Sequence, residues 1–197
     1  MRFALGMLLL PLLPSCSPDA PGKPKGAATA TATADDACTV AVSFVDHWLR
    51  QWKDGRPVVF SDTPDDTPNS PAPGPWFKLT GEYGEAPPAA MLANGVERPR
   101  DSAVARCPAL RAYLDRAKIP YGAKAEAAAV DKANGESLYG ADILGVTLPS
   151  VSPDGNQALI LTRSSSGPLA GGGQFLLLKR QPDGSWLAIS VQNAWVS

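Results

Sequence analysis

Few side chains in this sequence could carry out catalysis. His47 is the only histidine in the chain of 197 residues, whereas serine triads, zinc proteases and most metal sites use histidine. The HExxH, CxxC, Walker and GxSxG patterns do not occur. His47 falls beside Trp48 near the edge of an expected apolar helix face. We therefore expect a flanking or surface histidine rather than a metal ligand or a general base.

Three other arrangements have the residue types for chemistry but the wrong spacing. Cys38 and His47 lie nine residues apart, which is about 13 Å along one helix. The acidic pairs Asp35-Asp36 and Asp65-Asp66 are adjacent in sequence and are expected to be solvated. Three glycines at 171–173 would need to open a helix to cradle a phosphate, but an apolar strand follows them, so a flexible hairpin loop is expected. The sequence thus predicts no catalytic residue, no metal site and no cofactor.

The first sixteen residues have the pattern of a targeting signal rather than of a catalytic or binding site. Arg2 is followed by an apolar stretch from Phe3 to Leu13 and by Leu13-Pro14-Ser15-Cys16. This stretch is too short to span a bilayer but has the length of a signal-peptide core. Leu13 to Cys16 resembles the bacterial lipobox. Pro14 departs from it, because a small or aliphatic residue usually stands two positions before the cysteine. A spare thiol in a removed leader is the alternative for Cys16.

The lipobox resemblance implies an anchored protein. Residues 1–15 would be removed as a signal peptide, and Cys16 would become an acylated N-terminus held in the membrane by several chains. Ser17 implies sorting to the outer membrane, with the protein facing the periplasm. Residues 16–35 have no large apolar side chain, so they cannot offset their ordering entropy and read as a flexible tether.

Residues 36–197 are expected to form a single domain. Without the leader, Arg2 is lost, leaving 17 of the 18 basic residues against 19 acidic ones. A net charge near −2 gives no electrostatic footprint for nucleic acid. Cys38 and Cys107 remain, and in an oxidising compartment we expect them to form a disulfide. Two separate buried thiols are the alternative.

Three helices are expected in the first two thirds of this domain. Residues 36–52 show one apolar stripe at helical spacing, made of Val40, Phe44, Val45, Trp48, Leu49 and Trp52. Residues 107–117 form a second helix with Pro108 in its first turn, and alanine-rich residues 123–133 form a third. The proline-rich run at 63–75 cannot be regular structure. Trp76 follows it and could contact a partner, core packing being the alternative.

The last third changes to a β-meander. Four strands are expected at 142–148, 157–163, 174–180 and 186–194, with Pro-Asp-Gly turns before the second and fourth strands. Residues 175–178 are apolar on both faces, which favours a sheet covered by helices. The expected fold class is α+β, with two or three N-terminal helices packed on a cone-like, curved, four-stranded antiparallel meander.

This element order resembles the nuclear transport factor two-like and cystatin-like folds. The ending, with Gly167-Pro168-Leu169 and Trp195-Val196-Ser197, is similar to uncharacterised proteobacterial lipoproteins. Neither resemblance carries a catalytic residue. The first hypothesis is a non-enzymatic, membrane-tethered binding module with an envelope protein as partner, one form being an inhibitor or immunity protein. The alternative is a small-ligand binder or enzyme that uses a concave pocket.

The lipobox resemblance generates a direct test. Metabolic labelling with a fatty acid should tag the wild-type protein and should fail on Cys16→Ala, because this thiol is the expected acceptor. Cys107→Ala serves as the matched control and should keep the label. Labelling that survives Cys16→Ala would contradict the anchor.

Overall fold

The computed structural model describes residues 34–52, 55–64, 75–96, 101–131 and 138–196. Over these residues the helices are α1 (Ala34–Gln51), α2 (Ala89–Val96), α3 (Ala103–Arg106), α4 (Pro108–Ala117) and α5 (Ala123–Asp131). The strands are β1 (Val58–Phe60), β2 (Asp142–Val146), β3 (Ser150–Val151), β4 (Gln157–Gly167), β5 (Ala170–Arg180) and β6 (Trp186–Val196). Cys16, Asp65 and Asp66 lie outside the described residues, as do residues 1–15, the expected signal peptide, and nearly all of residues 16–35, the expected tether.

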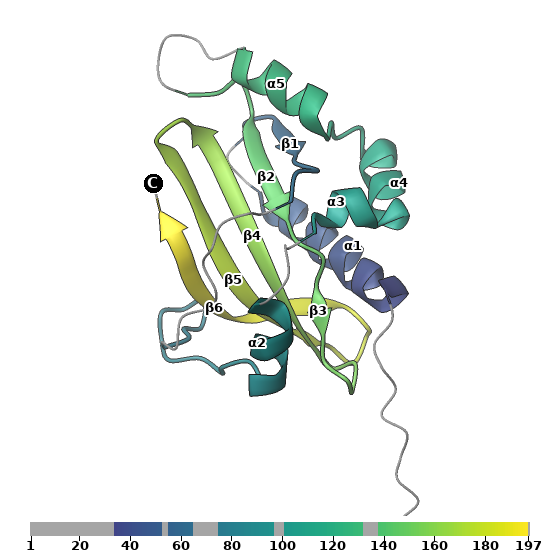
Figure 1. Cartoon of the computed structure of the whole chain (residues 1–197), viewed down its shortest axis with the longest axis vertical. Helices are drawn as coiled ribbons and strands as arrows, with labels where there is room; N and C mark the ends of the chain where they lie inside the picture. The colour runs from purple at the N-terminus through teal and green to yellow at the C-terminus, as the bar shows by residue number, and fades with distance from the viewer. Residues whose placement is uncertain (1–33, 53–54, 65–74, 97–100, 132–137, 197) are drawn as a thin grey trace, which may run out of the picture.

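The strands form one open, mixed sheet (Figure 1). Its order is β1-β2-β4-β5-β6, and β3 pairs with β4 beside β2. β1 runs parallel to β2, whereas the other pairs are antiparallel. The α+β class and the antiparallel order of the last strands are confirmed. The count of four strands is wrong, because β1 and β3 complete a six-stranded sheet.

The three expected helices are present with shifted ends. α1 begins at Ala34, two residues before the expected start, so Asp35 lies in its first turn with Asp36 rather than in the expected tether. α4 and α5 match the second and third helices, although α5 ends at Asp131. Short α2 and α3 were not expected, and α3 is a single turn before Cys107. Arg111 reaches back from α4 and donates 2.8 Å hydrogen bonds to the carbonyl oxygens of Val104 and Ala105 in α3.

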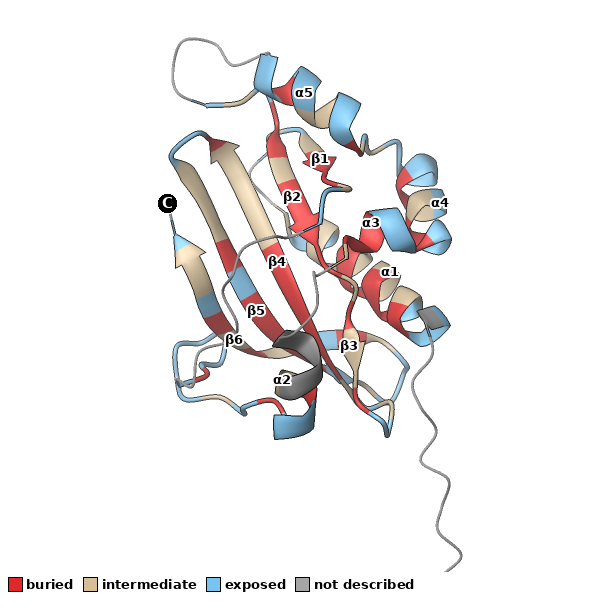
Figure 2. Ribbon diagram, in the orientation of Figure 1, coloured by how far each residue is buried: buried red, intermediate tan, exposed pale blue. Residues whose placement is uncertain are grey.

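The sheet is apolar on both faces, and each face has its own cover. Runs of buried residues mark β4 and β5 (Figure 2). Alternation along β4 and β5 sends one set of side chains toward α1 and the other set away from it. The α1 face packs against the helix stripe and α4, and its buried members include Val40, Phe44, Val45, Leu144, Ile160, Leu176 and Leu178. The opposite face packs against Trp76 and α2, and its buried members are Trp76, Met91, Leu159, Leu161, Phe175 and Leu177.

The expected flexible hairpin loop at the glycines 171–173 is wrong, because these residues lie within β5. β4 continues to Gly167 and β5 resumes at Ala170, so the connection is short. The glycines serve close packing: a Cβ on Gly173 would lie 2.4 Å from Nε1 of Trp195, which sits on the neighbouring strand. Gly145 likewise leaves room for a side chain, because a Cβ at this position would lie 2.3 Å from Nε of Arg163. Glycine is required here by the neighbouring side chains rather than by a turn.

The two Pro-Asp-Gly turns form as expected, and each is held by an aspartate. Asp154 Oδ1 accepts hydrogen bonds from Ser152 Oγ at 2.5 Å and from the Asn156 amide at 3.2 Å. Asp183 Oδ1 accepts from the Ser185 amide at 2.9 Å and from its hydroxyl at 2.7 Å. These hydrogen bonds to the charged form lower the pKa of both carboxyls.

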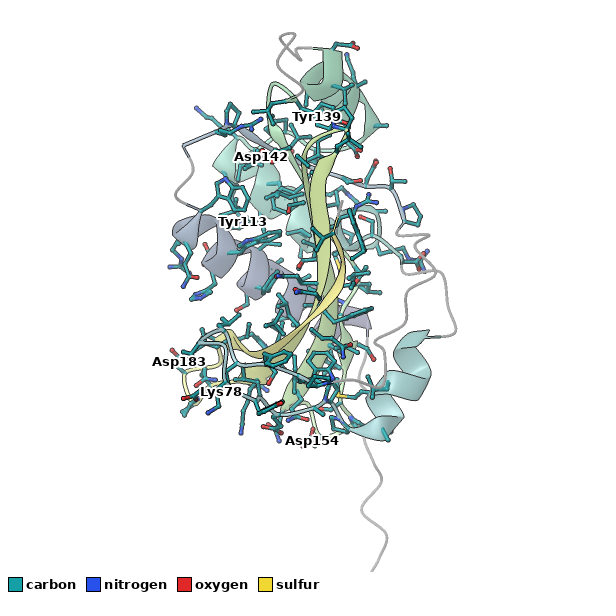
Figure 3. The ribbon with its side chains drawn as sticks, turned by 90° about the vertical axis from the view of Figure 1, so that its left-hand side faces the viewer. Lys78, Tyr113, Tyr139, Asp142, Asp154 and Asp183 are labelled. Carbon is teal, nitrogen blue, oxygen red and sulfur yellow. A yellow bond between two sulfur atoms is a disulfide. The ribbon has the colours of Figure 1, made fainter. Side chains whose placement is uncertain are left out.

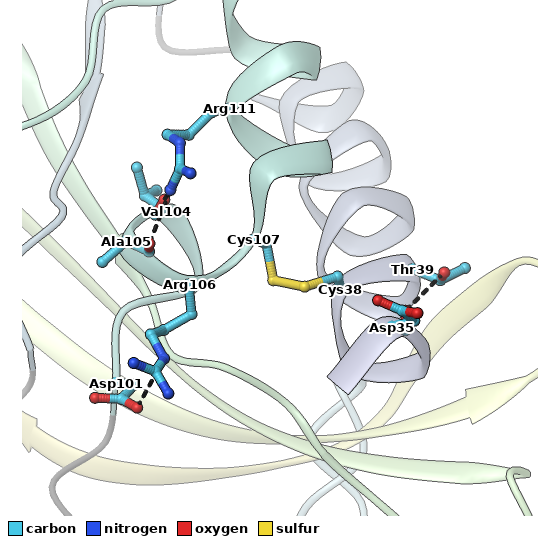
Figure 4. The surroundings of a disulfide bond; sticks show 9 residues. All are labelled: Asp35, Cys38, Thr39, Asp101, Val104, Ala105, Arg106, Cys107 and Arg111. Atoms are coloured by element: carbon cyan, nitrogen blue, oxygen red, sulfur yellow. Dashed lines mark hydrogen bonds and ion pairs between the residues drawn. A yellow bond between two sulfur atoms is a disulfide. The ribbon is translucent and has the colours of Figure 1, made fainter. Parts of the chain in front are cut away.

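Cys38 and Cys107 form a disulfide, as expected, with their Cα atoms 5.3 Å apart (Figure 4). The bond joins the first part of α1 to the residue that precedes α4. Cys107 is fully buried in the cluster beneath α1. The closed loop spans 69 residues, and it contains β1, α2 and α3.

Removing this bond should destabilise the domain. A chain-entropy model assigns about 4 kcal/mol to a loop of this length. Equilibrium unfolding in denaturant should therefore show the double variant Cys38→Ala/Cys107→Ala less stable by about that amount, with Cys16→Ala unchanged as the cysteine control. An equal free energy of unfolding for the double variant and the wild type would contradict the prediction.

The two turn aspartates should make stability depend on acid pH. Because their pKa values are lowered in the folded state, their contribution is complete above about pH 4, the range of an unfolded aspartate, and is lost as pH falls through the lowered values. Asp154→Asn/Asp183→Asn should flatten the acid side of the curve of unfolding free energy against pH. Asp115→Asn, on α4, is the exposed control, and an unchanged acid slope in the double variant would refute the role.

Candidate functional site

His47 is a partly exposed residue on α1, in keeping with the flanking position that was expected. Its Nε2 lies 2.9 Å from Nε2 of Gln51, one helical turn later. On the same helix, Asp46 accepts a 3.0 Å hydrogen bond from the Tyr113 hydroxyl and pairs with Arg50. Burial, followed by the contact with Asp46, raises the pKa of Tyr113. The bonds of Asp46 to Tyr113 and Arg50 connect α1 to α4. None of these bonds involves the ring of His47.

The buried carboxylate of Asp142 also has a structural partner. It opens β2 and is paired with Arg56 at 3.5 Å. Arg56 in turn donates a 2.6 Å hydrogen bond to the carbonyl oxygen of Tyr139 (Figure 3 labels Tyr139 and Asp142). The arginine thus joins the approach to β1 to the start of β2. Within the described residues no group of three histidine, cysteine, aspartate or glutamate side chains could hold a metal ion.

Trp76 is not the exposed aromatic that a partner contact requires. Its side chain is only 4% exposed and packs against Leu159, Leu161, Phe175 and Leu177 of the sheet. The alternative of core packing is therefore the one that the structure adopts. The physical reason is that this face of β4 and β5 is apolar and needs cover. Trp76 provides it just where the chain returns to the sheet.

Trp76 instead anchors a small β-hairpin, residues 76–84, which we term the aromatic hairpin. The Gly84 amide donates to the Trp76 carbonyl at 2.7 Å, and the Lys78 amide donates to the Glu82 carbonyl at 2.7 Å. A tight turn closes it, with the Gly81 amide on the Lys78 carbonyl and Gly81 at a φ of +89°. Glycine adopts that left-handed conformation without a steric cost.

The aromatic hairpin is fixed to the edge of the sheet. Phe77 and Val191 of β6 exchange two backbone hydrogen bonds, of 2.9 and 2.7 Å. Gly84 packs so closely that a Cβ there would lie 2.6 Å from Ser190 Oγ. Lys78, on the hairpin, lies at the end of the molecule that also carries Asp154 and Asp183 (Figure 3). The hairpin therefore has a defined position on β6.

The outer side of the aromatic hairpin is apolar and exposed. Alternation puts Phe77, Leu79 and Tyr83 on the side away from Trp76, and these residues are 37%, 67% and 78% exposed. The rings of Phe77 and Tyr83 stack at 5.6 Å between centroids with an angle of 22° between their planes. Lys78 and Glu82 form an exposed ion pair at 3.0 Å. Phe77, Leu79 and Tyr83 thus make an apolar surface on the outer side, and the backbone that carries them is fixed.

Sequence reasoning did not find this surface, although a signal was present. The residues from Phe77 to Tyr83 alternate apolar and polar types up to Thr80-Gly81, which is the pattern of a short hairpin with a glycine turn. The proline-rich run before Trp76 predicts irregular structure for the segment instead.

A groove of about 470 Å³ lies between α5, β1 and the connection from α4. Its walls are mostly small and aliphatic residues, including Val59, Ala125, Ala129 and Ala141. Lys118 contributes the charged side chain to the described lining. This lining offers little that could orient a polar substrate.

Comparisons with protein-family models, with curated proteins and with solved structures gave no match for this chain. None of the described helices is long and apolar enough to cross a membrane.

Proposed function

We propose that this protein is a lipid-anchored, periplasm-facing component of the bacterial cell envelope that binds another envelope protein through the aromatic hairpin. The observation that carries the proposal is the exposed, stacked pair Phe77 and Tyr83 beside Leu79. Exposed aromatic side chains that are already ordered are typical of the residues that dominate binding energy in protein interfaces.

The fixed position of the hairpin supports binding to a partner. Trp76 holds the hairpin from below, and the two hydrogen bonds with Val191 hold it from the side. Little conformational entropy would then be lost on association, which favours affinity. Exposed apolar side chains that lie together are also typical of surfaces that bind another protein.

Anchoring and binding fit together in this proposal. Acylation of Cys16 would hold the protein at the outer membrane, and residues 17–33 would give the domain reach toward a neighbour. An inhibitor or immunity protein that blocks an envelope-targeting enzyme is one concrete form, since a rigid aromatic hairpin can occupy a groove on such an enzyme. We include in this proposal that the domain is related to nuclear transport factor two-like folds and to uncharacterised proteobacterial lipoproteins.

The alternative, a ligand-binding or catalytic cone, has one observation in its favour. A small pocket with aromatic and polar walls lies at the end of α1. Its residues suit recognition rather than catalysis, because the lining contains hydroxyls, amides and indoles together with Arg163 but no carboxylate, histidine or cysteine within the described part of the chain.

In-cell photocrosslinking tests the hairpin as a binding surface. A photoreactive phenylalanine analogue at position 83 of the full-length protein should give a discrete protein adduct. The same analogue at position 116, an exposed arginine of α4, should not. Leu79→Ser in the protein that carries the analogue should lower the yield about tenfold, because it removes an apolar side chain that the partner would bury. At an exposed site such a substitution changes the stability of the domain by only about 0.5 kcal/mol.

Two results would contradict the proposed binding surface. No adduct from position 83, or the same adducts from positions 83 and 116, would show that the hairpin does not bind a specific protein. Comparing these results with fatty-acid labelling separates the binding surface from the anchor, since either can fail alone.

A further inference from the structure

The pocket at the end of α1 has the composition of a ligand site that is separate from the hairpin. It has a volume of about 240 Å³, and α1 and the three long strands line it. Its lining consists of Trp48, Trp52, Thr162, Arg163, Ser164, Gly172, Gly173, Gln174, Asn193, Trp195 and Val196. The last turn of α1 thus faces the ends of β4, β5 and β6 that lie beyond the main core.

Two tryptophans form one wall of the pocket, Trp48 in α1 and Trp52 directly after its last residue. Trp48 and Trp52 contact each other edge to face at 5.9 Å between ring centroids. Trp48 is held further by Phe44 at 5.6 Å and by Phe60 at 6.3 Å. The indole Nε1 of Trp52 is buried and has no hydrogen-bond partner within the described part of the chain. A buried donor left unpaired is costly, and the Nε1 of Trp195, in the same lining, is likewise buried and unpaired within the described residues.

The opposite wall is polar and uncharged. Strand alternation puts Thr162 and Ser164 on the face that also carries Ile160 and packs on α1, and pairing puts Gly172, Gln174 and Asn193 beside them. Gln174 Nε2 donates a 3.2 Å hydrogen bond to Asn193 Oδ1. Because each amide has a carbonyl and an NH₂ group, the pair keeps further donor and acceptor capacity. Gly172 adds no side chain to this wall.

The one charged residue of the described lining is engaged elsewhere. Arg163 follows Thr162 in β4, so its side chain lies on the opposite face of the sheet, above Gly145. Its guanidinium donates hydrogen bonds to Ser61 Oγ at 2.6 Å and to the Thr63 carbonyl at 3.3 Å. An anionic ligand would therefore find no free cation among the described lining side chains.

We propose that this pocket binds a neutral sugar residue. A sugar ring presents C–H groups that pack on the electron-rich face of an indole, and hydroxyls that exchange hydrogen bonds with hydroxyl and amide side chains. An aliphatic ligand would leave those polar groups unpaired. The volume is below the range of about 300–1,000 Å³ that is usual for drug-sized ligands, which fits one ring rather than a long chain.

Indole NMR signals test the proposal. The five tryptophans of the intact protein, purified in a detergent without sugar groups, give separate indole N–H signals that single substitutions assign. Titration with glucose and with N-acetylglucosamine should shift the signals of Trp48 and Trp52 saturably, for at least one of the sugars. The Trp76 signal should stay in place, since Trp76 packs on the other face of the sheet.

Two substitutions in the pocket give the matched evidence. Trp52→Phe shrinks the aromatic wall on which the sugar ring would pack, and Gln174→Ala removes an exposed amide that would hydrogen-bond a hydroxyl; each should weaken binding about tenfold. Gln181→Ala, in the turn between β5 and β6, is the glutamine control and should bind as the wild type does.

Failure would be visible in either experiment. The proposal is wrong if neither sugar shifts the Trp48 and Trp52 signals, or if the Trp76 signal moves as much as theirs. It is also wrong if Gln174→Ala binds as tightly as Gln181→Ala. Gln174 is exposed, so this comparison holds even if Trp52→Phe fails to fold.

Discussion

Residues 175–178 of β5 are apolar at every position, and their alternation gives the sheet two faces that water must not reach. Much of the remaining architecture answers this constraint. The stripe of α1 covers one face, and Trp76 with α2 covers the other. Both proposed surfaces lie at the margins of these two covers. The aromatic hairpin extends outward from Trp76, and the pocket opens where α1 ends over polar strand positions.

Periodicity in the sequence was enough to predict the elements whose own residues determine them. The stripe from Val40 to Trp52 predicts α1, and short apolar runs beside two Pro-Asp-Gly turns predict most of β4, β5 and β6. Two cysteines in a chain that is expected to be exported predict a disulfide, and Cys38 and Cys107 form it. β1, β3 and α3 have two to four residues each, too few for a periodic pattern. They form because longer elements offer them a place to pair or pack.

The site was harder to predict because distant residues decide which side chains are exposed. Trp76 follows a proline-rich run, and nothing beside it in sequence indicates that Phe175 and Leu177 will bury it. The glycines at 171–173 suggest a flexible loop until Trp195 is brought over Gly173 by β6. Likewise, the two tryptophans at the end of α1 meet Gln174 and Asn193 only after the sheet has formed. Local composition could name these residues but not their neighbours.

The position of the disulfide has a mechanical consequence. Cys38 lies four residues after the first residue of α1, so a pull on the N-terminus reaches the covalent bridge before it can peel the helix from the sheet. The aromatic hairpin lies inside the loop that the bridge closes. Tension between the N-terminus and a partner held at the hairpin would divide between two covalent routes, one through α1 and one through Cys107. A load between the proposed anchor and the proposed partner would thus be shared by both routes rather than concentrated on one helix.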